Sequence, residues 1–368
     1  MRHKRTVNRQ TKMIRSVWFI TLSLGVMAPC SAQTEMRSAA FRDALVASVC
    51  AEIHRVRQIG LRQDRSAVPA LLDILQKAVR DGVDEELLLV RPQRGMPWSA
   101  SYPAHLHTAT IVALGRLGDL RAIPVLEAFR NHHEYRRFAP LVSVAVARIK
   151  AEQAVPQADT LAKWQAKVER FAEALGLSLS DLISTVRQTR GVHSGRSAPA
   201  QPQLALRALA EMAAEAYRQG CQESFDWLQR AGVEWDADRA AWLTAELAVR
   251  SPEQRIAWLM EQIRTKSALT VVDEYLFQAL ADQGERAVPA LEKWLNALWD
   301  ERTSEKPAPY TRTDRMLRLC FALLSGTGSS RANSLLQQQR ELCQGNEYLR
   351  SNLALILKQS PWTFVSDW

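Results

Sequence analysis

Apolar residues along the chain recur at the spacing of one face of an α-helix. Between residues 68 and 79 they stand at intervals of three, four and seven positions, and similar stripes occupy residues 41–59 and 106–117. A stripe of this kind predicts an amphipathic helix whose apolar face is buried. No stretch alternates apolar and polar residues as a half-buried strand does. The pattern therefore predicts an all-α protein.

A short segment with an acidic residue, an arginine, an alanine and a proline precedes three of the predicted helices. The two clear copies are residues 64–71 and 119–126, and a third copy with a changed beginning is 284–291. A carboxylate at this place can accept N–H groups of the first helical turn, and proline is tolerated because those groups have no acceptor inside the helix. Gly60 and Gly118 follow the preceding stripes and are predicted to end those helices.

Helix, glycine, turn and second helix together predict a hairpin, which cannot bury its apolar face alone. Neighbouring hairpins must therefore stack on one another. Residues 113–126, ALGRLGDLRAIPVL, resemble the HEAT repeat in its short bacterial form, and the likeness extends over 41–150 and 268–358 but is absent between. The resemblance implies an α-solenoid of HEAT-like hairpins with an irregular helical middle, used mainly to bind proteins and without a catalytic residue. Pro69 and Pro124 are 124 − 69 = 55 residues apart, against roughly 40–47 in a standard repeat, which predicts an insertion.

Residues 1–32 have the features of a secretory signal peptide. Residues 1–15 contain six cations and no acid, residues 16–27 are mostly apolar, and Cys30-Ser31-Ala32 supplies small residues for cleavage. The apolar run is shorter than the roughly 20 residues that a membrane span needs. A transmembrane anchor and a lipoprotein at Cys30 are the alternatives, and a start at Met13 would leave a signal peptide with a shorter basic region. We therefore expect an exported protein, periplasmic or secreted, with no transmembrane span in its mature chain.

Removal of the leader changes the meaning of the net charge. The whole chain carries +9, and six of these charges belong to the leader, which leaves 9 − 6 = +3. Nucleic-acid binding depends on a concentrated basic surface. The mature chain offers no such excess of charge, so no nucleic-acid partner is expected.

Two helical arrays are expected in the mature chain. They occupy residues 33–190 and 204–368, and residues 191–203, rich in Gly, Ser and Pro, are expected to form a linker or long loop. The last three large aromatic residues of the chain are expected to form a tail that caps the last helix. These residues are Trp362, Phe364 and Trp368.

Four tryptophans gather in the middle of the chain. They are either large core residues between helices or the walls of an aromatic groove. The segment 251–254, Ser-Pro-Glu-Gln, predicts the start of a helix with a capping box. The four tryptophans are Trp227, Trp235, Trp242 and Trp258.

Two Pro-rich insertions carry exposed aromatic residues. In residues 91–103, three prolines and a glycine prevent regular structure, and residues 303–311 hold a parallel insertion. Exposed aromatic and Arg side chains on the loops of repeat proteins are typical of binding surfaces. The alternative is that Trp98 folds back onto the array. The predicted partner-binding residues are Arg94, Trp98, Tyr102 and Tyr310.

The histidines do not predict a metal site. His105 and His107 are two positions apart on a predicted helix, so they point about 200° from each other, and a zinc site needs three or four converging ligands. Solvated or locally bonded histidines are expected here and at His132 and His133. No metal and no cofactor is expected.

Four cysteines follow the leader, and export favours disulfide formation. If the helices before and after Gly326 pack antiparallel, Cys320 and Cys343 lie about 12 Å apart along the helix axis, beyond the reach of a disulfide. Buried free thiols are expected, with disulfides as the alternative. The four residues are Cys50, Cys221, Cys320 and Cys343.

Motifs of catalysis are absent from the sequence. It contains no Gly-x-Ser-x-Gly, no His-Glu-x-x-His, no phosphate-binding loop and no dinucleotide fingerprint. We therefore expect a scaffold that binds a protein or peptide and has no catalytic activity of its own. The alternatives are a binder of an envelope polymer or small ligand in a Trp-lined groove, and an enzyme or lyase-like chaperone for a cofactor.

Overall fold

The computed structural model describes residues 30–82, 102–187, 201–265, 274–305, 310–362 and 364. Over these ranges the regular structure is helical and contains no strand, so the all-α prediction is confirmed. Contacts divide the chain into a unit Met1–Phe41 and a unit Arg42–Trp368. The predicted leader falls within the first unit, and its residues 1–29 lie outside the described ranges.

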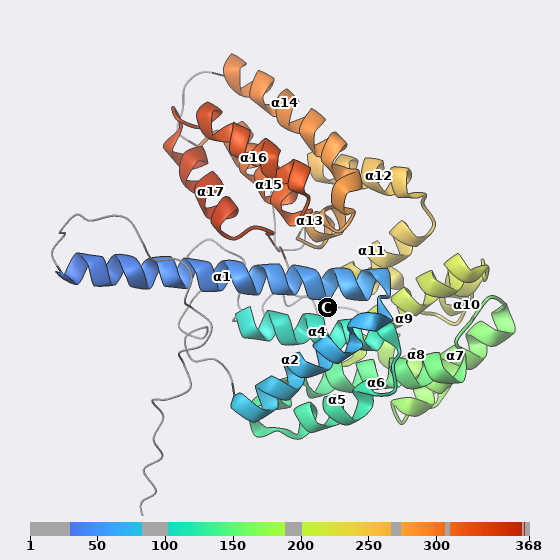
Figure 1. Ribbon diagram of the computed structural model, residues 1–368. Helices are drawn as coiled ribbons and strands as arrows, with labels where there is room; N and C mark the ends of the chain where they lie inside the picture. The colour runs from blue at the N-terminus through green and yellow to red at the C-terminus, as the bar shows by residue number, and fades with distance from the viewer. Residues whose placement is uncertain are drawn as a thin grey trace, which may run out of the picture. The chain divides into compact units, whose positions relative to one another are not determined.

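Figure 1 shows the helices in chain order. Short 3₁₀ segments, labelled η, stand before several of them. The first elements are α1 (Cys30–Arg62), η1 (Arg65–Ala67), α2 (Val68–Asp81), α4 (Tyr102–Leu117), α5 (Ala122–Asn131), η2 (His133–Phe138), α6 (Ala139–Ala154), α7 (Leu161–Ala174), α8 (Leu179–Arg187) and α9 (Gln201–Gln219). The others are α10 (Ser224–Arg230), η3 (Trp235–Ala237), α11 (Arg239–Ala248), α12 (Pro252–Arg264), α13 (Glu274–Ala281), η5 (Gly284–Ala287), α14 (Val288–Ser304), α15 (Arg312–Gly326), α16 (Ser330–Leu342) and α17 (Glu347–Lys358).

The three acid-to-proline segments form turns that open into helices, as predicted. Asp64 accepts the N–H of Ser66 at 3.1 Å before α2, and Asp119 accepts the N–H of Arg121 at 2.9 Å before α5. The third copy differs, because Glu285 accepts the hydroxyl of Ser329 instead of capping its own helix. The acidic residue of this segment therefore accepts a hydrogen bond either within its own turn or from a residue next to a neighbouring helix.

The prediction that Gly60 ends the first helix is wrong, whereas Gly118 has the predicted role. Gly60 lies inside α1, and the left-handed residue that ends this helix is Gln63, with φ 53°. A Cβ added at Gly60 would lie 3.0 Å from the Cα of Ala113, so the missing side chain lets α1 and α4 approach closely. Gly118 has φ 65° directly after α4.

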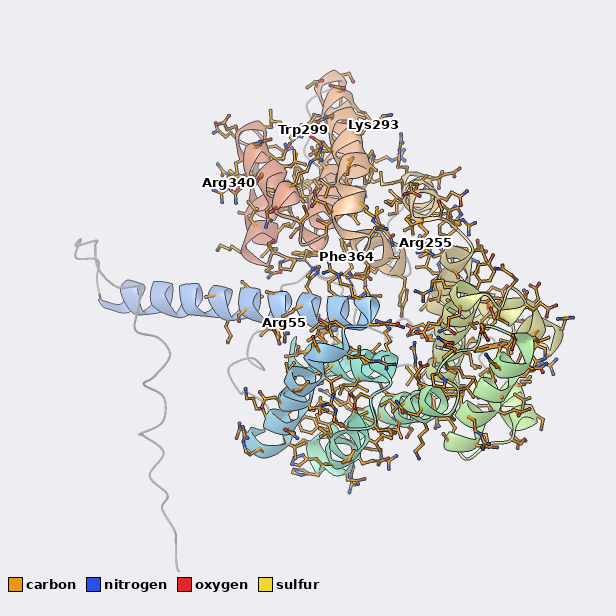
Figure 2. The ribbon with its side chains drawn as sticks, turned by 45° about the vertical axis from the view of Figure 1, so that its right-hand side comes forward. Arg55, Arg255, Lys293, Trp299, Arg340 and Phe364 are labelled. Carbon is orange, nitrogen blue, oxygen red and sulfur yellow. The ribbon has the colours of Figure 1, made fainter. Side chains whose placement is uncertain are left out.

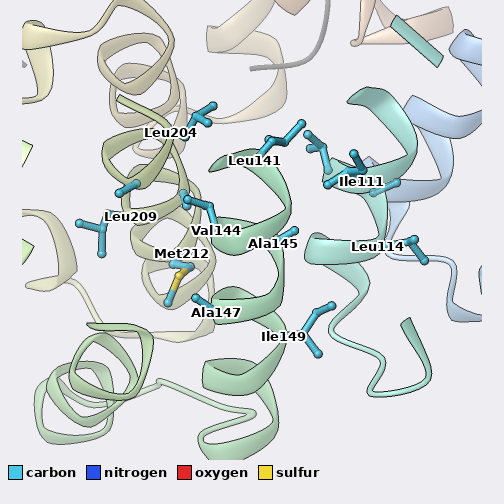
Figure 3. Packing of buried hydrophobic residues seen from close by; sticks show 14 of the residues in the cluster. Ile111, Leu114, Leu141, Val144, Ala145, Ala147, Ile149, Leu204, Leu209 and Met212 are labelled. Carbon is cyan, nitrogen blue, oxygen red and sulfur yellow. The ribbon is translucent and has the colours of Figure 1, made fainter. Parts of the chain in front are cut away.

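The first core contains a row of three helices, α4, α6 and α9. Figure 3 shows Val144 and Ala147 on the side of α6 that faces α9, and Ala145 and Ile149 on the side that faces α4. All four are buried. At Gly115 of α4 an added Cβ would lie 3.2 Å from the Cβ of Ala145, so the α4–α6 contact also depends on small residues. The middle helix is therefore apolar on two opposite faces.

The second core joins α12 to α17 and the end of the chain. Trp299 of α14 donates its indole N–H to the side chain of Gln339 on α16 at 2.7 Å, and Figure 2 labels this tryptophan. Phe364 packs its ring 5.6 Å from that of Phe277, and its N–H donates to Gln278 at 2.9 Å. The described part of the tail therefore covers α13 and α15 rather than the last helix, because Trp362 donates its N–H to Ser325 of α15.

The two clusters of buried residues, which we call the first and second cores, meet within α11. Buried residues from Val46 to Ala248 belong to the first core, and those from Leu243 to Phe364 to the second. Residues 201–203 belong to α9, and residues 191–200 of the predicted linker lie outside the described ranges. A further link joins α1 to the second core, since Arg57 pairs with Asp282 at 2.7 Å.

Candidate functional site

Of the four predicted partner-binding residues, the structure describes the side chain of one. Arg94 and Trp98 lie outside the described residues. Tyr102 is the first residue of α4, and its side chain is not described. Tyr310 stands shortly before the start of α15.

Tyr310 has an unusual backbone and an exposed ring. Its φ of 63° lies in the left-handed region, and its side chain is 66% exposed. The ring stands edge-on to that of Tyr348 near the start of α17, with 5.0 Å between ring centroids. Sequence reasoning missed Tyr348, because it is 38 residues away and inside a predicted helix. The two tyrosines form what we call the Tyr310 surface.

A buried carboxylate fixes the backbone next to the Tyr310 surface. Asp314 accepts the N–H of Thr311 at 3.0 Å, while Thr311 accepts the N–H of Asp314, which makes a capping box at the start of α15. The same carboxylate accepts from Arg302 of α14 and from Asn346 before α17, both at 2.9 Å. Three helices are thereby held at one point, and the position of Tyr310 follows from them.

The tryptophans of the middle are partly core and partly the wall of an open hollow. Trp235 and Trp242 line a hollow of about 430 Å³, together with the acidic residues Glu234, Asp236 and Glu246. Trp258 packs on Trp242, with 5.6 Å between ring centroids. The remaining lining residues are Gln229, Val233 and Ala245, so neither Trp227 nor Trp258 belongs to the wall.

An N-cap positions the wall of this hollow. Asp238 lies between the two lining tryptophans and accepts the N–H groups of Ala240 and Ala241 at 3.0 and 3.1 Å, which starts α11. Its carboxylate also accepts hydrogen bonds from Nε and Nη2 of Arg207 on α9, at 2.8 and 2.9 Å. Since this pair is buried, η3 and α11 are fixed relative to α9.

The four described histidines named from the sequence do not form a metal site. His105 and His107 are buried, not solvated, and His107 contacts the rings of Phe129, Tyr135 and Phe138. Within the described ranges no group of three or more His, Cys, Asp or Glu residues is placed to hold a metal ion. The four cysteines after the leader are free and buried, as predicted. Burial raises the pKa of the Cys50 thiol to about 12 and that of Cys343 to about 11.

Titratable groups with altered pKa values occur elsewhere, in packing positions. Burial alone would raise the pKa of Glu211, but the charges and hydrogen bonds of Arg116 and Arg148 outweigh it and hold that pKa well below 4.5. Burial raises the pKa of Glu274, at the start of α13, to about 8. Neither residue lines the hollow. These groups therefore do not supply an acid and base pair to it.

Comparison of the chain with protein-family models, with curated proteins and with solved structures finds no match. None of the described helices combines the length and the apolar character that a membrane crossing requires.

Proposed function

We propose that the mature chain is an exported α-solenoid of HEAT-like hairpins that binds a protein or peptide and performs no chemistry. Contacts between helices that are not neighbours in the chain support the solenoid. One row runs α4, α6, α9, α11, α13, α15 and α17, and a second row runs α12, α14 and α16. Two rows of stacked helices are what a chain of hairpins forms when each hairpin buries its apolar face on the next.

Export is supported by the basic and then apolar sequence of residues 1–27 and by the small residues at 30–32. Export can be tested by expressing the full chain in a bacterial host and sequencing the N-terminus of the periplasmic product. The expected product begins at Gln33. Recovery of the uncut chain in the cytoplasm, or of a chain held in the membrane, would contradict export.

The observation that carries partner binding is the Tyr310 surface. A non-glycine residue in the left-handed region costs about 1–2 kcal/mol, and a core contact does not compensate this cost because the ring is largely exposed. Backbone strain of this kind concentrates at functional positions. Tyrosine is also enriched among the residues that dominate protein interfaces. We infer that the strained turn presents Tyr310 and Tyr348 to the partner.

Tyr310→Asn is expected to weaken capture of the partner at least about tenfold, the effect of losing one aromatic anchor, and to leave the fold intact. Asparagine adopts the left-handed conformation more easily than tyrosine, so the free energy of unfolding should change by less than about 1 kcal/mol. The measurement is chemical crosslinking and pull-down from the periplasmic fraction, with urea unfolding of each variant.

Leu120→Asn is the matched control, because Leu120 is 52% exposed in a turn of the first core. Trp98→Ala and Tyr102→Ala test the first insertion in the same experiment. If Tyr310→Asn and Tyr348→Ala capture the same proteins as the unchanged chain, the Tyr310 surface is not the binding surface.

A further inference from the structure

The hollow beside η3 and α11 has two aromatic walls and a negative lining. All of its charged lining residues are acids, namely Glu234, Asp236 and Glu246, and its two largest side chains are Trp235 and Trp242. Its volume of about 430 Å³ lies within the range of roughly 300–1,000 Å³ that small-ligand sites occupy. Carboxylates repel anions, so the lining selects a ligand that is neutral or positively charged.

Cations already rest on the indole rings of this region. The guanidinium carbon of Arg239 lies 3.9 Å from the ring centroid of Trp242, and that of Arg250 lies 4.7 Å from that of Trp258. The face of an indole ring attracts cations through its quadrupole. Arg250 also pairs with Glu246 at 2.9 Å, at the edge of the hollow. Indole and carboxylate groups of this region therefore hold guanidinium groups of the chain itself, at Trp242 and at Glu246 of the lining.

Contacts within the chain hold the walls of the hollow in place. Trp235 is 5% exposed and stands edge-on to Phe225 at 5.5 Å, and the buried pair of Arg207 and Asp238 fixes the chain between the walls. The indole N–H of Trp235 has no hydrogen-bond acceptor among the residues that the structure describes. This donor can be satisfied by a water molecule or by a carbonyl oxygen of a ligand, because a guanidinium or ammonium group only donates.

We propose that this hollow binds an organic cation on a flexible chain, through a guanidinium or primary ammonium group. Free polyamines and arginine or lysine residues of a peptide share this chemistry. The cation would lie against Trp242 and Trp235 with Glu234 and Asp236 as its counter-charges. The site is separate from the Tyr310 surface, which lies before α15 and at the start of α17, and it does not depend on the proposed partner.

Titration of the purified mature chain with three probes tests the proposal. N-acetylarginine amide and spermidine carry the cation, and N-acetylcitrulline amide is the neutral isostere of the first probe. Binding is measured by calorimetry at low salt, with indole fluorescence as a second measurement. At least one cation should show saturable binding. The citrulline probe should bind at least about tenfold more weakly, which corresponds to about 1.4 kcal/mol. Whether arginine amide or spermidine binds more tightly distinguishes the two sources.

The double variant Glu234→Gln/Asp236→Asn keeps the shape of the lining and removes two charges. It should weaken cation binding at least about tenfold, whereas Glu169→Gln/Glu173→Gln, which removes two exposed carboxylates from α7, should not. Trp242→Leu should also weaken it, with fluorescence and circular dichroism checking the fold. Absence of saturable cation binding, equal binding of the citrulline probe, or unchanged binding by the lining variant would overturn the proposal. Tyr310→Asn should bind the cation normally, so the two proposals fail separately.

Discussion

Replacement of Glu211 by alanine is expected to lower the free energy of unfolding by about 3–5 kcal/mol, the range for breaking a buried ion pair on one side. Glu211 of α9 accepts from Arg116 of α4 at 2.6 and 3.0 Å and pairs with Arg148 of α6. Arg148 also pairs with Glu215, one helical turn further along α9. Loss of the shared carboxylate leaves Arg116 without this pair and Arg148 with one partner fewer, in a largely buried place.

The expected loss is large because the pairs are shielded from water. The side chain of Arg148 is 3% exposed and that of Glu211 15%. The same three helices form the apolar row of Figure 3, so the charges lie beside packed side chains that cannot adapt to an unpaired guanidinium. Urea unfolding followed by circular dichroism measures the effect. Glu173→Ala is the matched control: its partner Arg170 lies on the same exposed helix face, and such surface pairs contribute about 0–1 kcal/mol.

The pH dependence of the free energy of unfolding gives a second test of the ion pairs of Glu211. The pKa of Glu211 is lower in the folded chain than its ordinary 4.5. The contribution of the carboxylate is therefore complete above pH 4.5 and is lost as the pH falls toward the folded pKa, by about 1.4 kcal/mol per pH unit. The difference in stability between the unchanged chain and Glu211→Ala should narrow below pH 4.5. A difference below about 1 kcal/mol at pH 7 would show that water already screens the network.

Local features of the fold could be predicted from the sequence because neighbours along the chain decide them. The turns before Pro69 and Pro289 depend on residues within a few positions, and both prolines stand in the first turn of their helices. The capping box at Ser251 is likewise present, since Ser251 accepts the N–H of Gln254 and its own N–H donates to the side chain of Gln254. In each case the physical cause lies within one helical turn.

Features that depend on distant contacts escaped prediction. Gly60 and Gly118 each follow an apolar stripe, and only the position of Ala113 in space shows that Gly60 serves helix packing instead of helix termination. An exposed ring at Tyr310 was expected from its Pro-rich insertion, but the contact of this ring with Tyr348 was not. The hollow was foreseen only as a cluster of tryptophans. Which of them form a wall depends on Arg207, which lies about thirty residues before them and fixes η3 and α11.

Acid is also expected to destabilise the protein through His107, at a higher pH than the range in which Glu211 acts. The residue is 6% exposed on α4, and its ring lies 5.3 Å from that of Phe129 and 5.4 Å from that of Tyr135. Burial, and secondarily the charge of Arg137, lower the pKa of His107 from 6.5 to about 4. The neutral ring suits this apolar place, whereas the charged ring does not.

The direction of the pH effect follows from which state takes up the proton first. Between pH 6.5 and about 4 the unfolded chain binds a proton at His107 that the folded chain does not. The contribution of neutral His107 to the free energy of unfolding is therefore complete above pH 6.5 and decreases as the pH falls to about 4. At about 1.4 kcal/mol per pH unit the loss approaches about 3 kcal/mol. His107→Leu should remove most of this slope, as measured by urea unfolding at pH 7, 6, 5 and 4.

A part of the slope should remain in His107→Leu, because the pKa of His54 is also lowered, chiefly by burial. His133→Gln is the control, since that side chain is 77% exposed and should leave the slope unchanged. Between pH 6.5 and 4.5 the histidines act together with Glu274, whose pKa is raised to about 8 and whose protonation therefore stabilises the folded chain as the pH falls. Glu211 acts only below pH 4.5, so comparison of each variant with the unchanged chain separates the contributions. An equal slope in His107→Leu and the unchanged chain would mean that the folded state opens around α4 and admits the proton without unfolding.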